Sequence, residues 1–233
     1  ADKNAAEAAK KLNLKKQEEK RREEEKRREE IILQQKEQLL LRKRNKLMKS
    51  MKIHSSSQAV FWCSEKEQNE IFEGWEVLTG TIQSGKSKGQ VKKLGRISGN
   101  SVCLLTARKP DMLERDRYFT GLFMVDAEFI GSQCQDGLIP AHPEHRLRLS
   151  ERESRRMLFW NYFANEKFPS RMTWNAGRHR YLDNILVAQI LRDIVLLKKE
   201  EIEAAQAFLK YYCHMNHIRL NELPEPNGAL KRK

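Results

Sequence analysis

The sequence contains no apolar run that approaches 18 residues, the length that a membrane-spanning helix needs. Its four cysteines include no C-x-x-C pair, and a chain of 233 residues is too long and too charged for a disulfide scaffold. We therefore predict reduced thiols and no membrane span. The charged N-terminus has no apolar core behind it, which argues against a signal peptide, so we predict a cytoplasmic protein.

Glycine and proline are absent from the first 52 residues, which consist largely of charged side chains and strong helix formers. This segment holds 18 Lys and Arg against 10 Asp and Glu, and pairs such as Glu23 with Arg27 favour a helix. Leu33, Leu40 and Leu47 are spaced by seven residues, but too few heptads follow for a firm coiled-coil prediction. We predict a long charged helix that is either a solvated single helix or a seam for self-association or partner docking.

Acidic residues are too few to balance the basic ones, so the formal net charge is +13 and the pI about 9.6. The first 52 residues contribute +8 of this charge, which leaves +5 for the remainder, so both parts are basic. A balance of this kind favours an anionic partner, with nucleic acid first and an acidic protein or a membrane surface second. A basic protein whose charge serves only solubility is the plainer alternative.

From residue 53 the pattern becomes that of a folded domain, and Ser55, Ser56 and Ser57 mark the boundary. Short apolar segments with turn residues between them are typical of a small curled barrel. The expected strands lie at 59–63, 75–79, 101–106, 119–130, 137–139 and 146–149.

Helical patterns dominate the last third. Capping boxes begin at Ser64 and Ser150, and Asp183 is placed to cap a further amphipathic helix. We predict an α+β fold in which a long charged N-terminal helix precedes a small curled β-barrel-like module with C-terminal helices against it. The expected parts are a charged helical arm at 1–52, the β module at 53–150, a helical part at 151–219 and a flexible tail at 220–233.

Residues 80–87 match the phosphate-loop pattern G-x-x-x-x-G-K-[ST]. A true phosphate loop opens a helix whose dipole faces the anion, but the residues after Ser87 form a poor helix. We predict instead a basic hairpin loop that contacts phosphates without regard to sequence, through Lys86, Lys88, Lys92 and Lys93. Cys213, His214 and His217 lack a convincing fourth ligand, so we predict no metal, no cofactor and no catalytic residues.

Two apolar stretches resemble a strand–loop–strand element of the PUA-like superfamily, which includes PUA, ASCH and EVE/YTH modules. They are Ser101–Arg108 and Tyr118–Val125, with Glu114 and Arg115 in the charged loop between them. The opening strand Val60–Trp62 and the short helix after it also suit EVE-type members. The resemblance covers about residues 58–150 and implies a curled barrel that binds nucleic acid. In EVE/YTH relatives it implies an aromatic pocket for a flipped, often modified, base.

The segment 171–181 is dense in Arg, His, Trp, Asn and Tyr around one glycine, which is typical of a site loop. We expect Trp174 to stack on a base, Asn175 to read a base edge, and Arg178 and Arg180 to hold phosphates. The alternative is that Trp174 belongs to the core and the arginines form surface pairs. The full set of predicted nucleic-acid-binding residues is Trp62, Lys86, Lys88, Lys92, Lys93, Arg108, Trp174, Asn175, Arg178, His179 and Arg180.

The leading functional prediction is therefore a nucleic-acid-binding protein, for DNA or RNA, that recognises a modified or flipped base and has no membrane partner. Two alternatives stay open. One is a protein-interaction or scaffold subunit that docks through its helical arm, and the other is an unrecognised enzyme such as a nucleotide hydrolase or nuclease.

Overall fold

A computed structural model describes residues 2–50, 54–174 and 177–231. The chain divides into two units, residues 1–52 and 53–233, and each is considered by itself. The first unit is the helix α1 (Asp2–Ser50), which has no glycine or proline to interrupt its backbone hydrogen bonds. Among the helices that the structure describes, none has both the length and the apolar character that a bilayer crossing requires.

The second unit is built on a six-stranded curled sheet, a half-barrel, in the order β2-β5-β4-β3-β1-β6. β1 pairs with β3 in parallel, and every other neighbouring pair is antiparallel. The strands are β1 (Gln58–Trp62), β2 (Glu76–Leu78), β3 (Val102–Ala107), β4 (Tyr118–Val125), β5 (Leu138–Arg148) and β6 (His179–Leu182). The predicted α+β fold with a curled module and covering helices is confirmed.

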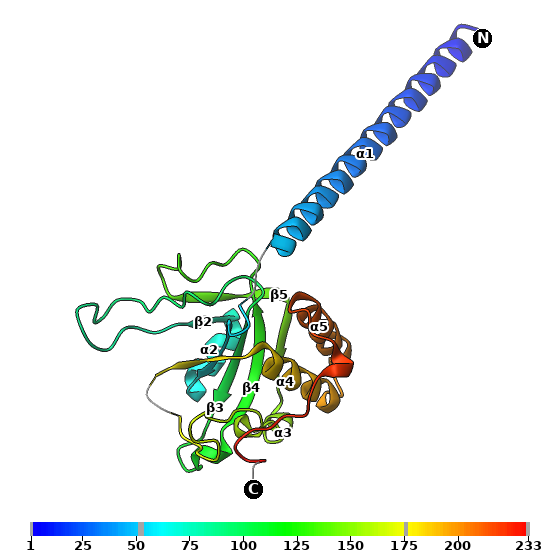
Figure 1. Cartoon of the computed structure of the whole chain (residues 1–233). Coiled ribbons are helices and arrows are strands. Elements are labelled where there is room, and N and C mark those ends of the chain that lie inside the picture. Colours follow the sequence, from blue (N-terminus) through cyan, green and yellow to red (C-terminus); the bar gives the residue numbers. More distant parts are fainter. Residues whose placement is uncertain (1, 51–53, 175–176, 232–233) are drawn as a thin grey trace. The chain divides into compact units, whose positions relative to one another are not determined.

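Both faces of the sheet are covered, which explains why the central strands have continuous apolar runs and not an alternating pattern. The four-turn helices α4 (Asn184–Leu197) and α5 (Ile202–Met215) cover one face. Residues of the sheet such as Leu104 are buried in the core between this face and the two helices. The shorter helix α2 (Glu65–Gly74) covers part of the other face, where Phe61 and Phe123 are fully buried. Figure 1 shows α2 on one side of the sheet and α4 and α5 on the other.

The predicted helix starts are found at the three expected residues. Ser64 and Ser150 each form a complete capping box with the glutamate three residues later, and the Asp183 side chain accepts a hydrogen bond from the backbone of Ile185. The helix after Ser150 is only one turn long, α3 (Glu151–Ser154), and the aromatic residues beyond it form a short 3-10 turn, Phe159–Asn161. Two further 3-10 turns are Glu114–Asp116 and Leu220–Glu222.

Two local expectations were wrong, and the strand expected at 119–130 is shorter than predicted, since β4 ends at Val125. The segments 137–139 and 146–149 were expected as separate strands around Pro140 and Pro143, but they belong to the single strand β5. Pro143 is tolerated because β5 bulges out of register with β4 between Ala141 and Arg146, so this proline has no ladder hydrogen bond to lose.

The second wrong expectation is the flexible tail at 220–233. Gly228, Ala229 and Leu230 donate backbone hydrogen bonds to the carbonyls of Asn161, Phe163 and Trp160, at 3.0 Å each. Ala229 is buried at 3% exposure, and a Cβ on Gly228 would lie 2.3 Å from the Trp160 oxygen. Residues 228–230 therefore form part of the folded unit, because the small side chains of Gly228 and Ala229 fit against the 3-10 turn at 159–161.

Candidate nucleic-acid interface

A cavity of about 560 Å³ opens where β1, β3 and β5 end and β4 begins. We call it the Trp62 cavity, and Trp62, Phe72, Arg108, Tyr118, Arg148 and Arg155 are among the residues that line it. The other four residues of β1 are completely buried, whereas the Trp62 side chain at the strand's end is 45% exposed. A large aromatic ring is thus held by a rigid strand but left open to solvent on the cavity wall.

Positive charge surrounds this ring. The cations Arg108, Lys109, Arg148 and Arg155 line the cavity, whereas its carboxylates are Glu65 and Glu151. Glu151 is ion-paired with Arg155 at 2.6 Å and with Lys109 at 3.9 Å, and these partners, Arg155 first, lower the pKa of its carboxyl. The Arg148 guanidinium lies 4.7 Å from the centre of the Phe72 ring. An anionic, flat ligand matches both the sign of the charge and the exposed ring.

Guanidinium groups and aromatic rings alternate beside the cavity. The Arg117 guanidinium carbon lies 5.7 Å from the centre of the Trp62 ring and 4.6 Å from that of Trp174. The Arg180 guanidinium carbon lies 5.1 Å from the centre of the Trp174 ring and 5.4 Å from that of Phe163. These distances are within the range of about 6 Å for cation–π contacts. We call the five residues the arginine–aromatic row, and it connects the end of β1 to β6.

Several arginines of this region have N–H groups that still lack an acceptor. Arg117 is only 2% exposed, and its Nε and Nη2 donate to the Glu114 carboxylate at 2.6 and 2.9 Å. Its Nη1 is buried without a hydrogen-bond partner among the residues that the structure describes, and so are the Nε atoms of Arg178 and Arg180. The Arg108 Nε makes no hydrogen bond either, but it lies 3.4 Å from a carboxylate oxygen of Glu114. Buried donors without partners cost about 1–3 kcal/mol each.

The row brings together two residues that the sequence predicted separately, Trp62 and Trp174, but it gives them different surroundings. Trp174 is half-buried against the core, its Nε1 donates to the Gly177 carbonyl at 2.9 Å, and its ring centre lies 5.4 Å from that of Phe159. With Arg117 and Arg180 also over the ring, a base has little access to it. The prediction that Trp174 stacks on a base stays a prediction, while Trp62 is the ring that opens onto a cavity.

Arg178 and His179 lie at the start of the edge strand β6, beside β1, and both contact neighbouring elements. Arg178 forms an ion pair with Glu67 of α2, and its carbonyl accepts the Trp62 backbone N–H at 2.8 Å. His179 lies between Phe61 and Tyr181, and burial, followed by the Lys92 charge, lowers its pKa from 6.5 to about 4. A neutral imidazole adds no charge for phosphates at neutral pH. Asn175 lies outside the described residues.

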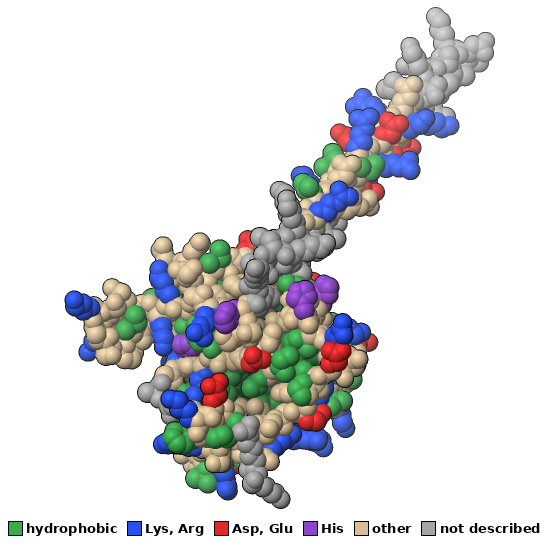
Figure 2. Space-filling view, viewed as in Figure 1, with side chains coloured by type: hydrophobic (Ala, Val, Ile, Leu, Met, Phe, Trp, Pro, Cys, Tyr) green, Lys and Arg blue, Asp and Glu red, His purple; other side chains and the backbone are tan. Residues whose placement is uncertain are grey.

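The stretch that matched a phosphate loop is a hairpin, as predicted. Thr81 and Val91 form an antiparallel bridge, and Ile82 and Gly89 are joined by a backbone hydrogen bond of 2.9 Å. Residues 86–89 form turns and not the first turn of a helix, so this loop has no helix dipole to face a nucleotide phosphate. Lys86, Lys88 and Lys93 are exposed and Lys92 is half-buried. The loop projects from the sheet in Figure 1, and Figure 2 shows basic side chains at the end of the projection.

Sequence reasoning missed much of the cavity. Phe72, Lys109, Tyr118, Arg148 and Arg155 line it, but they come from α2, β4, the end of β5 and the residues around β3 and α3. No spacing in the sequence connects these segments, because the sheet order brings them together. The buried Arg117 was missed for another reason. Its guanidinium is stabilised by the rings of Trp62 and Trp174, and these contacts form only in the folded structure.

The thiol on the wall of the Trp62 cavity is not activated as a nucleophile. Burial raises the pKa of the Cys63 thiol to about 12, so the cysteine on the cavity wall stays protonated and non-nucleophilic at neutral pH. Of the three residues that were considered as zinc ligands and set aside, Cys213 is buried and its pKa is raised to about 11, which opposes the thiolate that zinc needs.

A different group of ligand-type residues lies on β5. The ligand atoms of His142, Glu144 and His145 are within 4.8 Å of one another. The two imidazole rings are stacked, with centres 4.6 Å apart and planes 18° apart, and the Glu144 backbone N–H donates to His142 Nδ1. A metal ion lies in the plane of each imidazole that binds it, and two nearly parallel, separate planes do not share one ion position. The arrangement therefore needs a ring rotation before it could chelate a metal.

The fold and the cavity define an α+β protein with a curled half-barrel sheet and an aromatic, basic cavity at the strand ends. Comparison with known proteins finds no matching family model, no matching curated protein and no matching solved structure.

Proposed function

We propose that the protein binds nucleic acid and places one unstacked base against Trp62 in the Trp62 cavity. The observation that carries this proposal is the exposed Trp62 ring at the end of an otherwise buried strand, in a cavity that is lined by four cations and two carboxylates. A base has a flat aromatic face for the ring, and the phosphates beside it carry the charge that the cations attract.

The size of the cavity selects the form of the ligand. About 560 Å³ lies within the range of roughly 300–1,000 Å³ that is usual for small-ligand sites. One nucleotide fits such a space, whereas a duplex does not. The proposed ligand is therefore a single strand, or a duplex from which one base is extruded, which is consistent with the predicted resemblance to PUA-like modules.

The protonated, buried thiols of Cys63 and Cys103 suit a reducing compartment, and we propose the cytoplasm.

The arginine–aromatic row and the hairpin loop have supporting roles in this proposal. The row places the buried Arg117 guanidinium 5.7 Å from the centre of the Trp62 ring, a cation–π contact that supports the position of the ring. Lys86, Lys88 and Lys93 extend from the hairpin and add phosphate contacts that are independent of sequence.

The test is a binding titration of the full chain with a short fluorescent oligonucleotide, as a single strand and as a duplex, over a series of salt concentrations. We expect log affinity to fall linearly with log salt and the single strand to bind more tightly than the duplex. Absence of binding to both DNA and RNA strands at low salt would refute the proposal.

Trp62→Ala and Trp62→Phe form the matched pair of variants. Loss of the ring should cost about 1–3 kcal/mol of binding, whereas the phenylalanine variant keeps a stacking face and most of the affinity. If Trp62→Ala binds as tightly as the unmodified protein, the base does not stack on this residue. Binding of ATP or GTP that Lys86→Ala abolishes would instead favour the nucleotide hydrolase alternative.

A second candidate function is docking through α1, and one observation favours it. Ile31, Ile32, Leu33 and Leu39 are between 49% and 58% exposed on a helix of 49 residues. Helices usually bury such side chains, so this stripe suits a second helix, from another copy or from a partner. The side chains of Leu40 and Leu47 lie outside the described residues. Changing the four residues to alanine should abolish any self-association that sedimentation detects, and unchanged association would exclude the stripe as the contact.

A further inference from the structure

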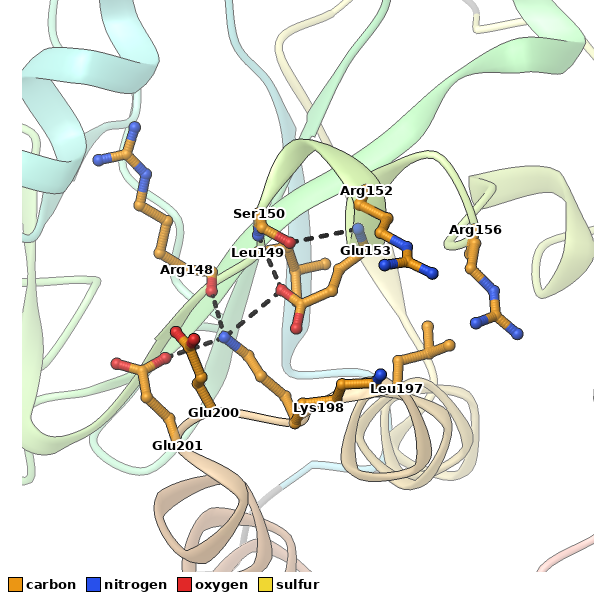
Figure 3. A pocket seen from close by; sticks show the side chains of 11 residues that line it. Arg148, Leu149, Ser150, Arg152, Glu153, Arg156, Leu197, Lys198, Glu200 and Glu201 are labelled. Atoms are coloured by element: carbon orange, nitrogen blue, oxygen red, sulfur yellow. Dashed lines mark hydrogen bonds and ion pairs between the residues drawn. The ribbon is translucent and has the colours of Figure 1, made fainter.

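A second cavity, of about 550 Å³, lies between α3 and the loop that joins α4 to α5. We call it the α3–α5 cavity, and Figure 3 shows the side chains that line it. Its cationic side chains are Arg148, Arg152, Arg156, Lys198 and Lys199, and its carboxylates are Glu153, Glu200 and Glu201. None of these residues was predicted as a binding residue from the sequence.

One wall of this cavity is fixed by Lys198, whose side chain is only 5% exposed. Its Nζ donates to the Arg148 carbonyl at 2.8 Å and to the Glu201 carboxylate at 2.9 Å, and it lies 3.5 Å from the Glu153 carboxylate. Glu153 also accepts the backbone N–H of Ser150 at 2.8 Å. The buried lysine thus ties together the end of β5, the start of α3 and the start of α5, so the wall is rigid.

This network uses two of the three carboxylates and leaves other cations without partners. Among the residues that the structure describes, Arg152, Arg156 and Lys199 have no carboxylate within ion-pair distance. All three are exposed. In Figure 3 the guanidinium groups of Arg152 and Arg156 lie on the same side of α3, near Leu197 and away from the ion pairs of Lys198. Glu200 likewise has no cation within ion-pair distance among the described residues, so three unpaired cations outnumber one unpaired carboxylate and the net unpaired charge of the cavity is positive.

The two cavities share a wall at the end of β5. Arg148 and Leu149 line both of them. The Arg148 carbonyl belongs to the Lys198 network, whereas its side chain extends in the opposite direction in Figure 3, toward Phe72 and the Trp62 cavity. Residues at and beside α3 also alternate between the two linings, with Glu151 and Arg155 in the Trp62 cavity and Arg152 and Arg156 in the α3–α5 cavity, so the two cavities are neighbours.

We propose that the α3–α5 cavity binds backbone phosphates of the strand whose base occupies the Trp62 cavity, an inference that rests on the proposed function. Arginine suits this ligand because its planar guanidinium binds two phosphate oxygens at once. Arg152 and Arg156 are the phosphate-binding residues, Lys199 adds charge, and Lys198 positions the wall.

The first experiment compares the double variant Arg152→Ala, Arg156→Ala with Lys210→Ala, Arg219→Ala, in which two exposed cations that line neither cavity are removed. Oligonucleotide affinity is measured against salt for both. The cavity variant should lower the slope of log affinity against log salt by about 1 for each phosphate that the protein no longer neutralises, and it should weaken all sequences alike. The control should change the slope less. Equal slopes for the two variants would overturn the inference while leaving the proposed function intact.

The second experiment places the phosphate. Single phosphodiesters of the oligonucleotide are replaced, one position at a time, by neutral methylphosphonates. The unmodified protein should lose affinity most at one or two positions, and the Arg152→Ala, Arg156→Ala variant should be insensitive at those same positions. Sensitivity that is identical in both proteins overturns the inference.

Free inorganic phosphate carries the same anionic oxygens as a backbone phosphate. A competition experiment between inorganic phosphate and the oligonucleotide distinguishes these two ligands of the α3–α5 cavity. If phosphate occupies the cavity in the unmodified protein but does not compete with the oligonucleotide, the cavity serves a small phosphorylated ligand and the inference fails. If the unmodified protein binds no strand at all, the proposed function fails together with it. Trp62→Ala distinguishes the two sites, because it should reduce affinity without changing the salt slope.

Discussion

The guanidinium carbon of Arg117 lies 4.6 Å from the centre of the Trp174 ring, and the Arg117 side chain is almost completely buried. A buried guanidinium needs both an anion and an apolar or aromatic cover, and here Glu114 provides the first and Trp174 the second. The relationship makes Trp174 a structural partner of the arginine, and this separates its role from that of the exposed Trp62.

The first prediction follows from that difference. Trp174→Ala should lower the free energy of unfolding by about 2–3 kcal/mol, because it leaves a hole beside Phe159 and uncovers Arg117. Trp62→Ala should cost less than about 1 kcal/mol, since the ring is 45% exposed. Urea denaturation followed by circular dichroism measures both, and equal losses would contradict the different roles.

Adjacent lysines provide the second prediction. Lys198→Met removes a buried cation and leaves the carboxylates of Glu153 and Glu201 without it, which should destabilise the fold by about 3 kcal/mol. Lys199→Met, at an exposed position, should change the unfolding free energy by less than about 0.5 kcal/mol. The same denaturation assay compares them. Similar stability for the two variants would mean that Lys198 does not hold the cavity wall together.

The docked C-terminal segment gives the third prediction. Gly228→Ala would place a Cβ 2.3 Å from the Trp160 carbonyl oxygen, and relieving this contact should cost about 1–3 kcal/mol. Gly95→Ala is the matched control, because a Cβ there meets nothing within 4 Å. The melting temperature should fall for the first variant and stay nearly constant for the second. A neutral Gly228→Ala would show that the segment does not dock in this way.

The fourth prediction concerns pH. The folded state lowers the pKa of His179 from 6.5 to about 4, chiefly through burial, so the unfolded chain binds more protons between these values. The stability linked to His179 is therefore fully present above pH 6.5 and is lost as the pH falls toward about 4.

His179→Gln should remove this part of the acid sensitivity, about 1 kcal/mol after allowance for the solvent screening of a half-exposed ring. His214→Gln, at an exposed helical position, is the control substitution. Denaturation at a series of pH values tests both. An unaltered profile for His179→Gln would show that the imidazole is not held neutral.

The elements that sequence analysis predicted correctly are those whose signals are local. Runs such as Val102–Ala107 are apolar on both faces because the strand is covered on both sides, and Ser64 with Glu67 defines a helix start within four residues. The strand β6 was missed because His179–Leu182 has no apolar run and becomes a strand only by pairing with β1 at the sheet edge.

The candidate site was predicted in part for the same reason. Trp62 and Arg108 were chosen as single residues, and they do line one cavity. Their proximity to Arg148 and Phe72 depends on the order of the strands in the sheet, which no local sequence pattern predicts. Trp174 was predicted from its polar neighbours, but the covering guanidinium groups of Arg117 and Arg180 come from the three-dimensional arrangement.

The most direct test of base binding at Trp62 is a double-mutant cycle between the ring and the base. Affinity is measured for the unmodified protein and for Trp62→Ala, each with an intact oligonucleotide and with strands in which one nucleotide at a time is abasic. We predict one position where base removal costs the unmodified protein about 1–3 kcal/mol and costs Trp62→Ala almost nothing, so that the two changes are not additive. If the two losses add independently at every position, no base stacks on Trp62 and the proposed function of the cavity is wrong.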